Sequence, residues 1–265
     1  MTLTRIAMGV EYDGARFHGF QAQTNSPETQ TIQQSLELAL SKIAAHPVRV
    51  VCAGRTDAGV HALEQVIHFD STATRSLRAW VLGCNASLPR EIKIQWARNV
   101  SSDFHARFSA TAREYQYVIY NNWTRPALFQ NKVTWQCRPL NEVSMQQAAQ
   151  YWLGQHDFSS FRAAECQAKS PVRTLAKFNI ERKSDFIVAC ISADAFLHHM
   201  VRNMMGVLIP IGEGLKDIEW AKTVLEHRDR AKGGITAPPF GLYLNKINYP
   251  ECFGLPQATH PMMLF

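Results

Sequence analysis

The chain has 265 residues, of which 46% are hydrophobic, so it can bury a substantial core and does not have the composition of a disordered protein. Its 28 lysines and arginines exceed its 22 aspartates and glutamates, and the formal charge of +6 permits, without proving, a polyanionic partner such as nucleic acid. The six cysteines lack CxxC spacing, and the longest apolar run, MMGVLIPIG, is too short to span a bilayer. We therefore expect a cytoplasmic protein with no disulfide or zinc framework and no membrane anchor.

The first part of the chain predicts strands alternating with helices. TRIAMGVEYDG reads as a strand that ends in a turn at Asp13 and Gly14. Thr31 and Gln34 form a capping-box pattern, and an apolar stripe behind them continues a helix to Ile43. Further strands are expected at VRVVCA, VIHFD, EIKIQWARNV and AREYQYVIYN, with a second helix over residues 74–89.

The second part predicts a helix over residues 143–154, a hairpin over 172–194 that turns at 183–185, helices over 198–209 and 217–230, and a final strand over 241–249. These elements favour a mixed α+β protein of two similar-sized lobes, with helices packed on largely antiparallel sheet. The periodicity is interrupted at NNWTRPALFQNK, so the expected lobes are residues 1–122 and 123–265.

The stretch GRTDAGVHA places one carboxylate, Asp57, in a loop between Gly54 and Gly59. Carboxylate hydrolases use a pair of acids, and metal sites need several converging ligands, so a lone aspartate fits neither. Arg55 nearby would keep Asp57 ionised and able to act as a nucleophile. Short Asp-Gly loops are, however, usually plain turns in which the aspartate caps its own backbone, and this stretch alone favours that structural interpretation.

In FHARFSATAREYQYVIYNNW, rings alternate with cations at Phe104, His105, Arg107 and Phe108. Such interleaving suits unpaired bases and a phosphate backbone. Further along, Arg113, Tyr115, Tyr117 and Ile119 would share one face of a strand. The alternative is that the tyrosines fill a core with their hydroxyls at its edge, and the pattern supports the two interpretations equally.

In AFLHHMVRNMMG, His198 and His199 are adjacent, so on a helix they would point apart and could not chelate one ion. Helical spacing predicts a core stripe of Met200, Met204, Val207 and Leu208. His199, Arg202 and Gly206 would lie on the opposite side, where Gly206 permits close packing and Arg202 either meets an anion or is solvated.

Two other stretches carry weaker signals. GQHDFSSFRAAECQ holds His156, Asp157 and Ser159, but neighbouring positions on a regular element cannot supply triad geometry and no Gly-x-Ser-x-Gly elbow is present. In FGLYLNKI, Leu242 and Leu244 read as core residues of a strand. The sequence also contains neither a P-loop nor a dinucleotide-binding fingerprint.

Taken together, VEYDGARFHGFQAQ, GRTDAGVHA, FHARFSATAREYQYVIYN, HDFSSFRA, HHMVRNMMG and FGLYL resemble the tRNA pseudouridine synthase A (TruA) family along nearly the whole chain. The resemblance implies that Asp57 is a nucleophile attacking uracil C6 or ribose C1′, that Tyr115 stacks on the target base, and that Arg202 pairs with Asp57. It also implies that Leu242 packs under the base and that Arg55 tunes Asp57 or fills the space left by the extruded base.

The same resemblance implies the pseudouridine synthase fold, with two lobes of antiparallel sheet around a basic cleft, and a homodimer that needs no cofactor or metal. The implied substrate is the anticodon arm of tRNA at uridines 38, 39 and/or 40. Residues expected to contact the RNA are Arg55, Phe104, His105, Arg107, Phe108 and Leu242. A tRNA-binding or tRNA-folding protein without catalysis is one alternative. A nucleoside or glycoside hydrolase is another, with Glu64 or Asp70 as its second acid.

Overall fold

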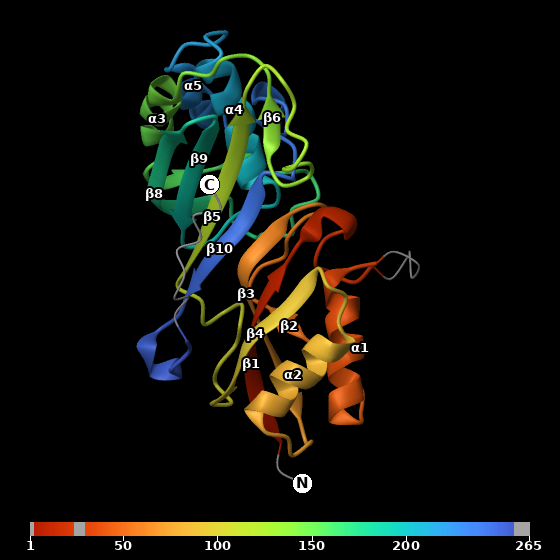
Figure 1. Cartoon of the computed structure of the whole chain (residues 1–265). Helices are drawn as coiled ribbons and strands as arrows, with labels where there is room; N and C mark the ends of the chain where they lie inside the picture. Colours follow the sequence, from red (N-terminus) through yellow and green to blue (C-terminus); the bar gives the residue numbers. More distant parts are fainter. Residues whose placement is uncertain (1–2, 24–29, 257–265) are drawn as a thin grey trace. The chain divides into compact units, whose positions relative to one another are not determined.

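The computed structural model describes residues 3–23 and 30–256 and divides the chain into two compact units. The first unit extends from the N-terminus to Thr111 and takes the chain up again from Tyr243 onward, and the second comprises Ala112–Leu242. Figure 1 labels the helices and strands of each unit.

These units differ from the expected lobes of residues 1–122 and 123–265 at both boundaries. The first boundary precedes β5 (Ala112–Asn121), because this strand pairs antiparallel with β9 (Phe186–Ala193) of the second unit. The second boundary arises because the chain returns to the first unit in β10 (Leu242–Asn248). The polar segment over residues 121–132, which interrupts the periodicity, is thus a connection within the second unit.

The first unit contains an antiparallel core of three strands in the order β4 (Ile92–Val100), β1 (Thr4–Tyr12) and β3 (His61–Ser71). The short β2 (Val51–Cys52) adds to β3, and β10 pairs with β3 in the parallel sense. Strand β3 is longer than VIHFD predicts and β2 is shorter than VRVVCA predicts.

Two helices belong to the first unit, α1 (Ile32–Ala44) and α2 (Leu77–Ser87), and they contact each other while α2 packs on β4. The predicted capping box is confirmed, since the Thr31 hydroxyl accepts from the Gln34 amide at 3.3 Å and the Gln34 side chain accepts from the Thr31 amide at 3.2 Å. Phe69 of β3 meets Trp80 of α2 edge to face at 5.2 Å, and both rings are buried.

In the second unit the strand order is β5, β9, β8 (Val172–Lys183) and β7 (Gly154–Asp157), all antiparallel, while β6 (Thr134–Gln136) runs parallel to β5. The helices are α3 (Glu142–Gln150), α4 (Met200–Gly212) and α5 (Trp220–His227), and α3 packs on β8 and α4. The predicted hairpin turns at Ser184, which has a φ of 54°. Mixed α+β architecture with largely antiparallel strands is therefore confirmed.

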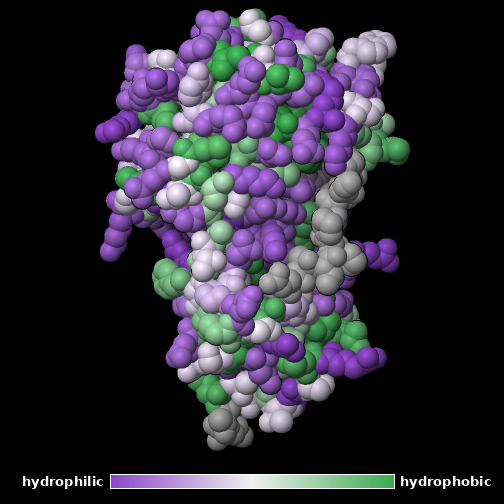
Figure 2. Space-filling view, turned by 90° about the vertical axis from the view of Figure 1, so that its left-hand side faces the viewer, coloured by the Kyte–Doolittle hydropathy of each residue, from purple (hydrophilic) through white to green (hydrophobic). Residues whose placement is uncertain are grey.

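Short 3-10 turns occupy Gly14–Arg16, Ser159–Phe161, Arg230–Lys232 and Glu251–Phe253. Within residues 3–23 and 30–256, no helix has both the length and the apolar character needed to cross a membrane. The face drawn in Figure 2 is predominantly hydrophilic, with hydrophobic residues scattered over it, as is usual for a face in contact with water.

Candidate active site

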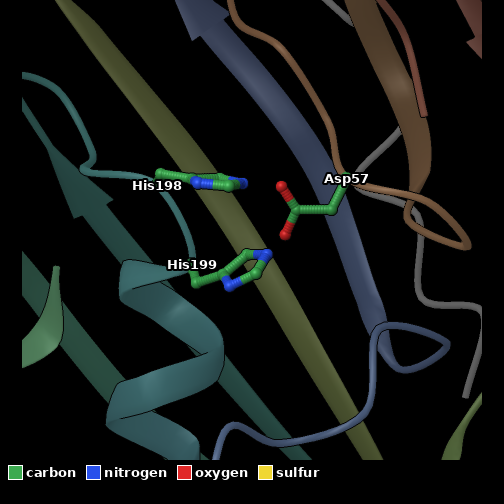
Figure 3. Close-up of side chains that lie close together, drawn as sticks. All are labelled: Asp57, His198 and His199. Atoms are coloured by element: carbon green, nitrogen blue, oxygen red, sulfur yellow. The ribbon is translucent and has the colours of Figure 1, made fainter. Parts of the chain in front are cut away.

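The Asp57 loop, residues 53–60, joins β2 to β3 in the first unit (Figure 3). Three hydrogen bonds hold the loop: the Phe20 amide donates to the Thr56 carbonyl at 3.0 Å, the Gln65 side chain donates to the Gly54 carbonyl at 2.6 Å, and the Tyr12 and Thr56 side chains share a hydroxyl–hydroxyl bond of 2.8 Å. These buried partners fix the loop before any substrate is present. Asp57 itself is half-buried. Because the loop that carries it is fixed by these hydrogen bonds, the Asp57 carboxylate is preorganised.

Two glycines allow the chain to fold this tightly. Gly59 has a φ of 79° and Gly19 a φ of 87°, values that side chains rarely adopt. A Cβ on Gly19 would also lie 2.7 Å from the Thr56 carbonyl oxygen. The segment that contains Gly19 therefore supports the Asp57 loop from outside, which the sequence pattern of the loop alone does not reveal.

Cys52 and Arg55 precede Asp57 in the chain, and they differ in exposure and charge. Arg55 is exposed. Burial raises the pKa of the Cys52 thiol to about 12, although the positive charge of Arg55 opposes the shift. Cys52 is therefore a thiol, and not a nucleophilic thiolate, at neutral pH.

The second unit carries Tyr115 on β5, with its ring edge-on to Phe196 at 4.9 Å and 8% of the residue exposed. The predicted shared face is confirmed, because Arg113, Tyr115, Tyr117 and Ile119 are all buried. Tyr117 is fully buried and bonds to the Thr134 hydroxyl at 2.7 Å and to the Pro238 carbonyl at 2.8 Å. Tyr117 thus fits the core interpretation of the tyrosines, whereas Tyr115 keeps a small accessible surface.

Arg202 lies in the first turn of α4, and its Nε donates to the Ala237 carbonyl at 2.9 Å. The guanidinium is thereby oriented by the backbone of a segment 35 residues further along the chain. Leu242 is the first residue of β10 and is 5% exposed. The predicted methionine stripe of α4 is buried, as expected, at Met200, Met204, Val207 and Leu208.

His198 and His199 do not lie on the helix, so the expectation that their rings point apart is wrong. The helix begins at Met200, and His199 precedes it with a φ of 61°. This left-handed residue turns the chain so that the two rings lie with centroids 4.0 Å apart, as Figure 3 shows for the segment leading into α4. No serine, threonine, aspartate or asparagine marks this helix start in the sequence, which is why the helix was expected to begin earlier.

The exposed Arg107 and Phe108, together with the half-buried His105, form a platform in the connection between β4 and β5. The Phe108 side chain is 75% exposed, the His105 ring stacks on it at 4.3 Å, and the Arg107 guanidinium lies 5.6 Å from its centroid. The His105 Nδ1 accepts from the amides of Arg107 and Phe108, each at 3.2 Å. Burial and the nearby Arg5 charge lower the pKa of His105, which keeps its Nδ1 available as an acceptor at neutral pH.

Arg5 and His68 support this platform from below. Arg5 donates to the carbonyls of Ser102 and Phe104 at 2.5 and 3.0 Å while making two bonds of 2.8 Å to Asp70. The His68 Nδ1 accepts from the Ala106 amide at 3.1 Å, and burial together with the neighbouring His105 lowers the pKa of His68 to about 4. The turn that carries the platform is therefore held by hydrogen bonds, and the lowered pKa values keep the imidazoles of His68 and His105 neutral at neutral pH.

Phe104, which the sequence places with the RNA-contacting residues, is instead a core residue. It is 0% exposed, and its ring packs 5.2 Å from both Tyr249 and Phe253. A ring enclosed in this way cannot offer a face to a base. The alternation of rings and cations predicted a common surface, but the segment turns and sends Phe104 inward.

The sequence-based expectation that Phe108 contacts RNA predicts that Phe108→Ala weakens binding of a tRNA transcript by about tenfold, since the loss of one stacked base would cost roughly 1–3 kcal/mol. The melting temperature should stay close to that of the wild type, since the side chain is largely exposed. Filter binding and thermal denaturation measure the two effects. The matched control is Leu82→Ala, another exposed apolar residue of the first unit, which should leave the affinity unchanged. Equal affinities for the two variants would remove Phe108 from the RNA-contacting surface.

Asp70 and Glu64, the candidates for the second acid of a hydrolase, are each tied up by their surroundings, Asp70 by an ion pair and Glu64 by burial. Asp70 is held by Arg5, and this hydrogen bond lowers the pKa of its carboxyl, so it stays ionised and engaged. Glu64 is 4% exposed, its Oε2 has no hydrogen-bond partner, and burial raises its pKa to about 7.

In the second unit, His156 bonds to the Leu153 carbonyl and Asp157 accepts from Ser159, so these groups stabilise a local turn.

A family model described as tRNA pseudouridine synthase matches residues 8–109 and 148–250 of the chain. The chain therefore belongs to the tRNA pseudouridine synthase family. Within it, the chain is similar to proteins named tRNA pseudouridine synthase A. The protein of that name from Alcanivorax borkumensis is 54% identical over 254 residues, which cover 96% of this chain and 94% of that protein. Those from Pseudoalteromonas atlantica and Pseudomonas aeruginosa are 55% and 54% identical, and each match covers 96% of this chain, with 95% and 89% of the relatives.

Proposed function

We propose that the chain is an isomerase that converts uridine to pseudouridine in tRNA. One observation carries the proposal: a chain that matches tRNA pseudouridine synthase A proteins over 96% of its length keeps a single aspartate on a rigidly held loop. The reaction breaks the bond between uracil N1 and ribose C1′ and forms a bond between C5 and C1′. C5 loses a proton and N1 gains one, so neither water nor a redox cofactor enters the balance.

In this proposal Asp57 is the nucleophile, which attacks uracil C6 or ribose C1′. Tyr115 stacks on the target base and offsets part of the few kcal/mol needed to remove it from its stack. Arg202 pairs with Asp57 and keeps it ionised, and Leu242 packs under the base. Arg55 tunes Asp57 or fills the space that the base leaves. The orientation of Arg202 by the Ala237 carbonyl and the small exposed surface of Tyr115 support these roles.

The RNA partner in this proposal is the anticodon arm, with reaction at uridines 38, 39 and/or 40, and the enzyme works as a cytoplasmic homodimer. His105, Arg107 and Phe108 contact the arm outside the reacting nucleotide. The formal charge of +6 and the exposed ring and cation of the platform support such a contact. The proposal needs no metal, because the chemistry requires only nucleophilic attack and proton transfer.

The test is release of tritium from a tRNA transcript labelled at uridine C5, followed by mapping of the modified position. The proposal expects stoichiometric release and pseudouridine within positions 38–40. Binding of tRNA without release would favour the non-catalytic tRNA-binding protein. Free uracil in the product would favour the hydrolase, since only hydrolysis leaves the base detached from its ribose.

Binding of tRNA should weaken steeply with salt, because each lysine or arginine that neutralises a phosphate releases condensed counterions. We expect a linear fall of the logarithm of the association constant with the logarithm of salt concentration. Arg107→Gln should reduce the slope by about one unit. Arg49→Gln, a change at an exposed arginine paired with Glu37, is the control and should leave the slope unchanged. An unchanged slope in Arg107→Gln would show that Arg107 makes no phosphate contact.

A further inference from the structure

The segment of residues 229–239 between α5 and β10, here called the strap, is tied to α4 at several points. Backbone contact is so close that a Cβ on Gly206 would overlap the Ile235 carbonyl oxygen, and a Cβ on Gly234 would overlap the Gly206 carbonyl. Only glycine fits at either position. The predicted close packing of Gly206 is confirmed, and its partner is the strap.

One guanidinium organises the strap. Arg230 donates to the Gly234 carbonyl at 2.9 Å, to the Asn203 side-chain oxygen at 3.0 Å and to the Thr236 hydroxyl at 2.9 Å. Asn203 is 2% exposed and also accepts from the Thr236 hydroxyl at 2.7 Å, while its amide donates to the Phe161 carbonyl at 2.8 Å. Breaking this network would leave buried polar groups without partners, so it is costly to disturb.

The start of the strap is fixed by the 3-10 turn Ser159–Phe161, which lies much earlier in the chain. The Asp229 amide donates to the hydroxyl of Ser160, a residue that is 0% exposed. Ser160 belongs to HDFSSFRA, a stretch that contributes to the family resemblance but in which the sequence assigns this serine no role. In the structure, the Ser160 hydroxyl holds the backbone of Asp229, the residue next to Arg230.

The far end of the strap holds Arg202. The Ala237 amide donates to the Arg202 carbonyl at 3.1 Å, and the Ala237 carbonyl accepts from the Arg202 Nε at 2.9 Å. Ala237 thus makes hydrogen bonds to both the backbone and the side chain of Arg202. Tyr117 of β5 adds a bond to the Pro238 carbonyl at 2.8 Å, so this end of the strap is also tied to the sheet.

We propose that Arg230 is a positioning residue that, through Asn203, Thr236 and Gly234, fixes the strap so that Ala237 holds the Arg202 guanidinium in one orientation. The inference rests on the proposed function only in assigning a catalytic duty to Arg202. Arg230 itself does not touch the reacting atoms. It acts on the reaction by limiting the freedom of Arg202, and a small misplacement of a catalytic group can cost up to about 100-fold in rate.

Three variants separate this role from simple loop anchoring. Arg230→Met removes all three hydrogen bonds of the guanidinium, Thr236→Val removes one hydroxyl at nearly constant shape, and Lys232→Met removes an exposed charge from the same strap. Thr236→Val keeps the proposal testable if Arg230→Met fails to fold. Arg230→Lys restores the charge and part of the bonding, so it should rescue part of the effect.

The first readout is the Nε–H resonance of Arg202 in protein labelled with ¹⁵N-arginine, assigned by its disappearance in Arg202→Lys. We expect its exchange with solvent to be about tenfold faster in Arg230→Met, intermediate in Thr236→Val and Arg230→Lys, and unchanged in Lys232→Met. The second readout is single-turnover tritium release, expected to fall about 10- to 100-fold in Arg230→Met with tRNA affinity within about threefold of the wild type.

Unchanged exchange of the Arg202 Nε–H in Arg230→Met overturns the proposal. Faster exchange with an unchanged single-turnover rate overturns it as well, because Arg202 would then not need to be fixed. If the wild type releases no tritium, the proposed function fails, and the resonance alone decides whether Arg230 positions Arg202.

Discussion

Asp57→Asn should lower the single-turnover rate of tritium release by at least about 10⁴-fold while tRNA affinity stays within about threefold of the wild type. Asparagine has nearly the shape of aspartate and keeps one of its acceptor oxygens, but its amide is not a nucleophile. The backbone of the Asp57 loop is held by Tyr12, Phe20 and Gln65 and not by the Asp57 side chain alone, so the loop should keep its form.

Asp13→Asn is the matched control for this experiment. Asp13 accepts from the Ala15 amide at 3.1 Å in another tight turn of the same unit, and asparagine can make the same bond. Asp57→Ala, measured in parallel, guards against activity from slow deamidation of the new asparagine. Substantial release by Asp57→Ala would place the nucleophile elsewhere and remove the central assignment of the mechanism.

Glu64→Gln should stabilise the protein by roughly 2–3 kcal/mol at pH 8 and have little effect at pH 4.5. Burial raises the pKa of Glu64 from 4.5 to about 7, so the folded chain retains a proton that the unfolded chain has already lost between these values. The free energy of unfolding contributed by this group therefore falls by up to about 1.4 kcal/mol per pH unit from pH 4.5 to 7, and the loss is complete above pH 7.

Thermal and urea denaturation at several pH values measure the effect, with Glu226→Gln as the control. Glu226 is exposed on α5 and has only a 3.9 Å contact with Lys222, so its substitution should change stability by less than about 0.5 kcal/mol. Equal stabilities of wild type and Glu64→Gln across the pH range would mean that the Glu64 carboxyl reaches water or a cation when charged. The prediction would then be wrong.

Elements with local signals could be predicted from the sequence. The capping box at Thr31, the hairpin turn at Ser184 and the alternation along β5 each depend on residues within a few positions of one another. The family resemblance identifies the Asp57 loop, but the residues that hold this loop, Tyr12, Phe20 and Gln65, come from other segments. No pattern within GRTDAGVHA specifies them.

The remaining features depend on pairings that are distant along the chain. Phe104 and Phe108 look alike in the sequence, but contacts of their segment with Arg5 and His68 accompany the burial of one ring and the exposure of the other. Arg230 is the last residue of the helix predicted over residues 217–230, yet its partner Asn203 lies 27 residues earlier. A hydrogen bond between a partly buried guanidinium, such as that of Arg230, and a distant amide leaves no periodic pattern in the sequence, so a single sequence does not reveal it.

The parallel pairing of β10 with β3 has a consequence for synthesis on the ribosome. Tyr243 and Leu244 pair with His61 and Ala62, so this first part of β3 lacks a partner on that edge until translation has passed β10, whereas β2 already covers Ile67 and His68. At about 5–20 residues per second, the N-terminal segment waits on the order of ten seconds with an open strand edge. Such edges template aggregation, so we expect nascent chains that stop before residue 242 to need a chaperone that the full-length chain can release.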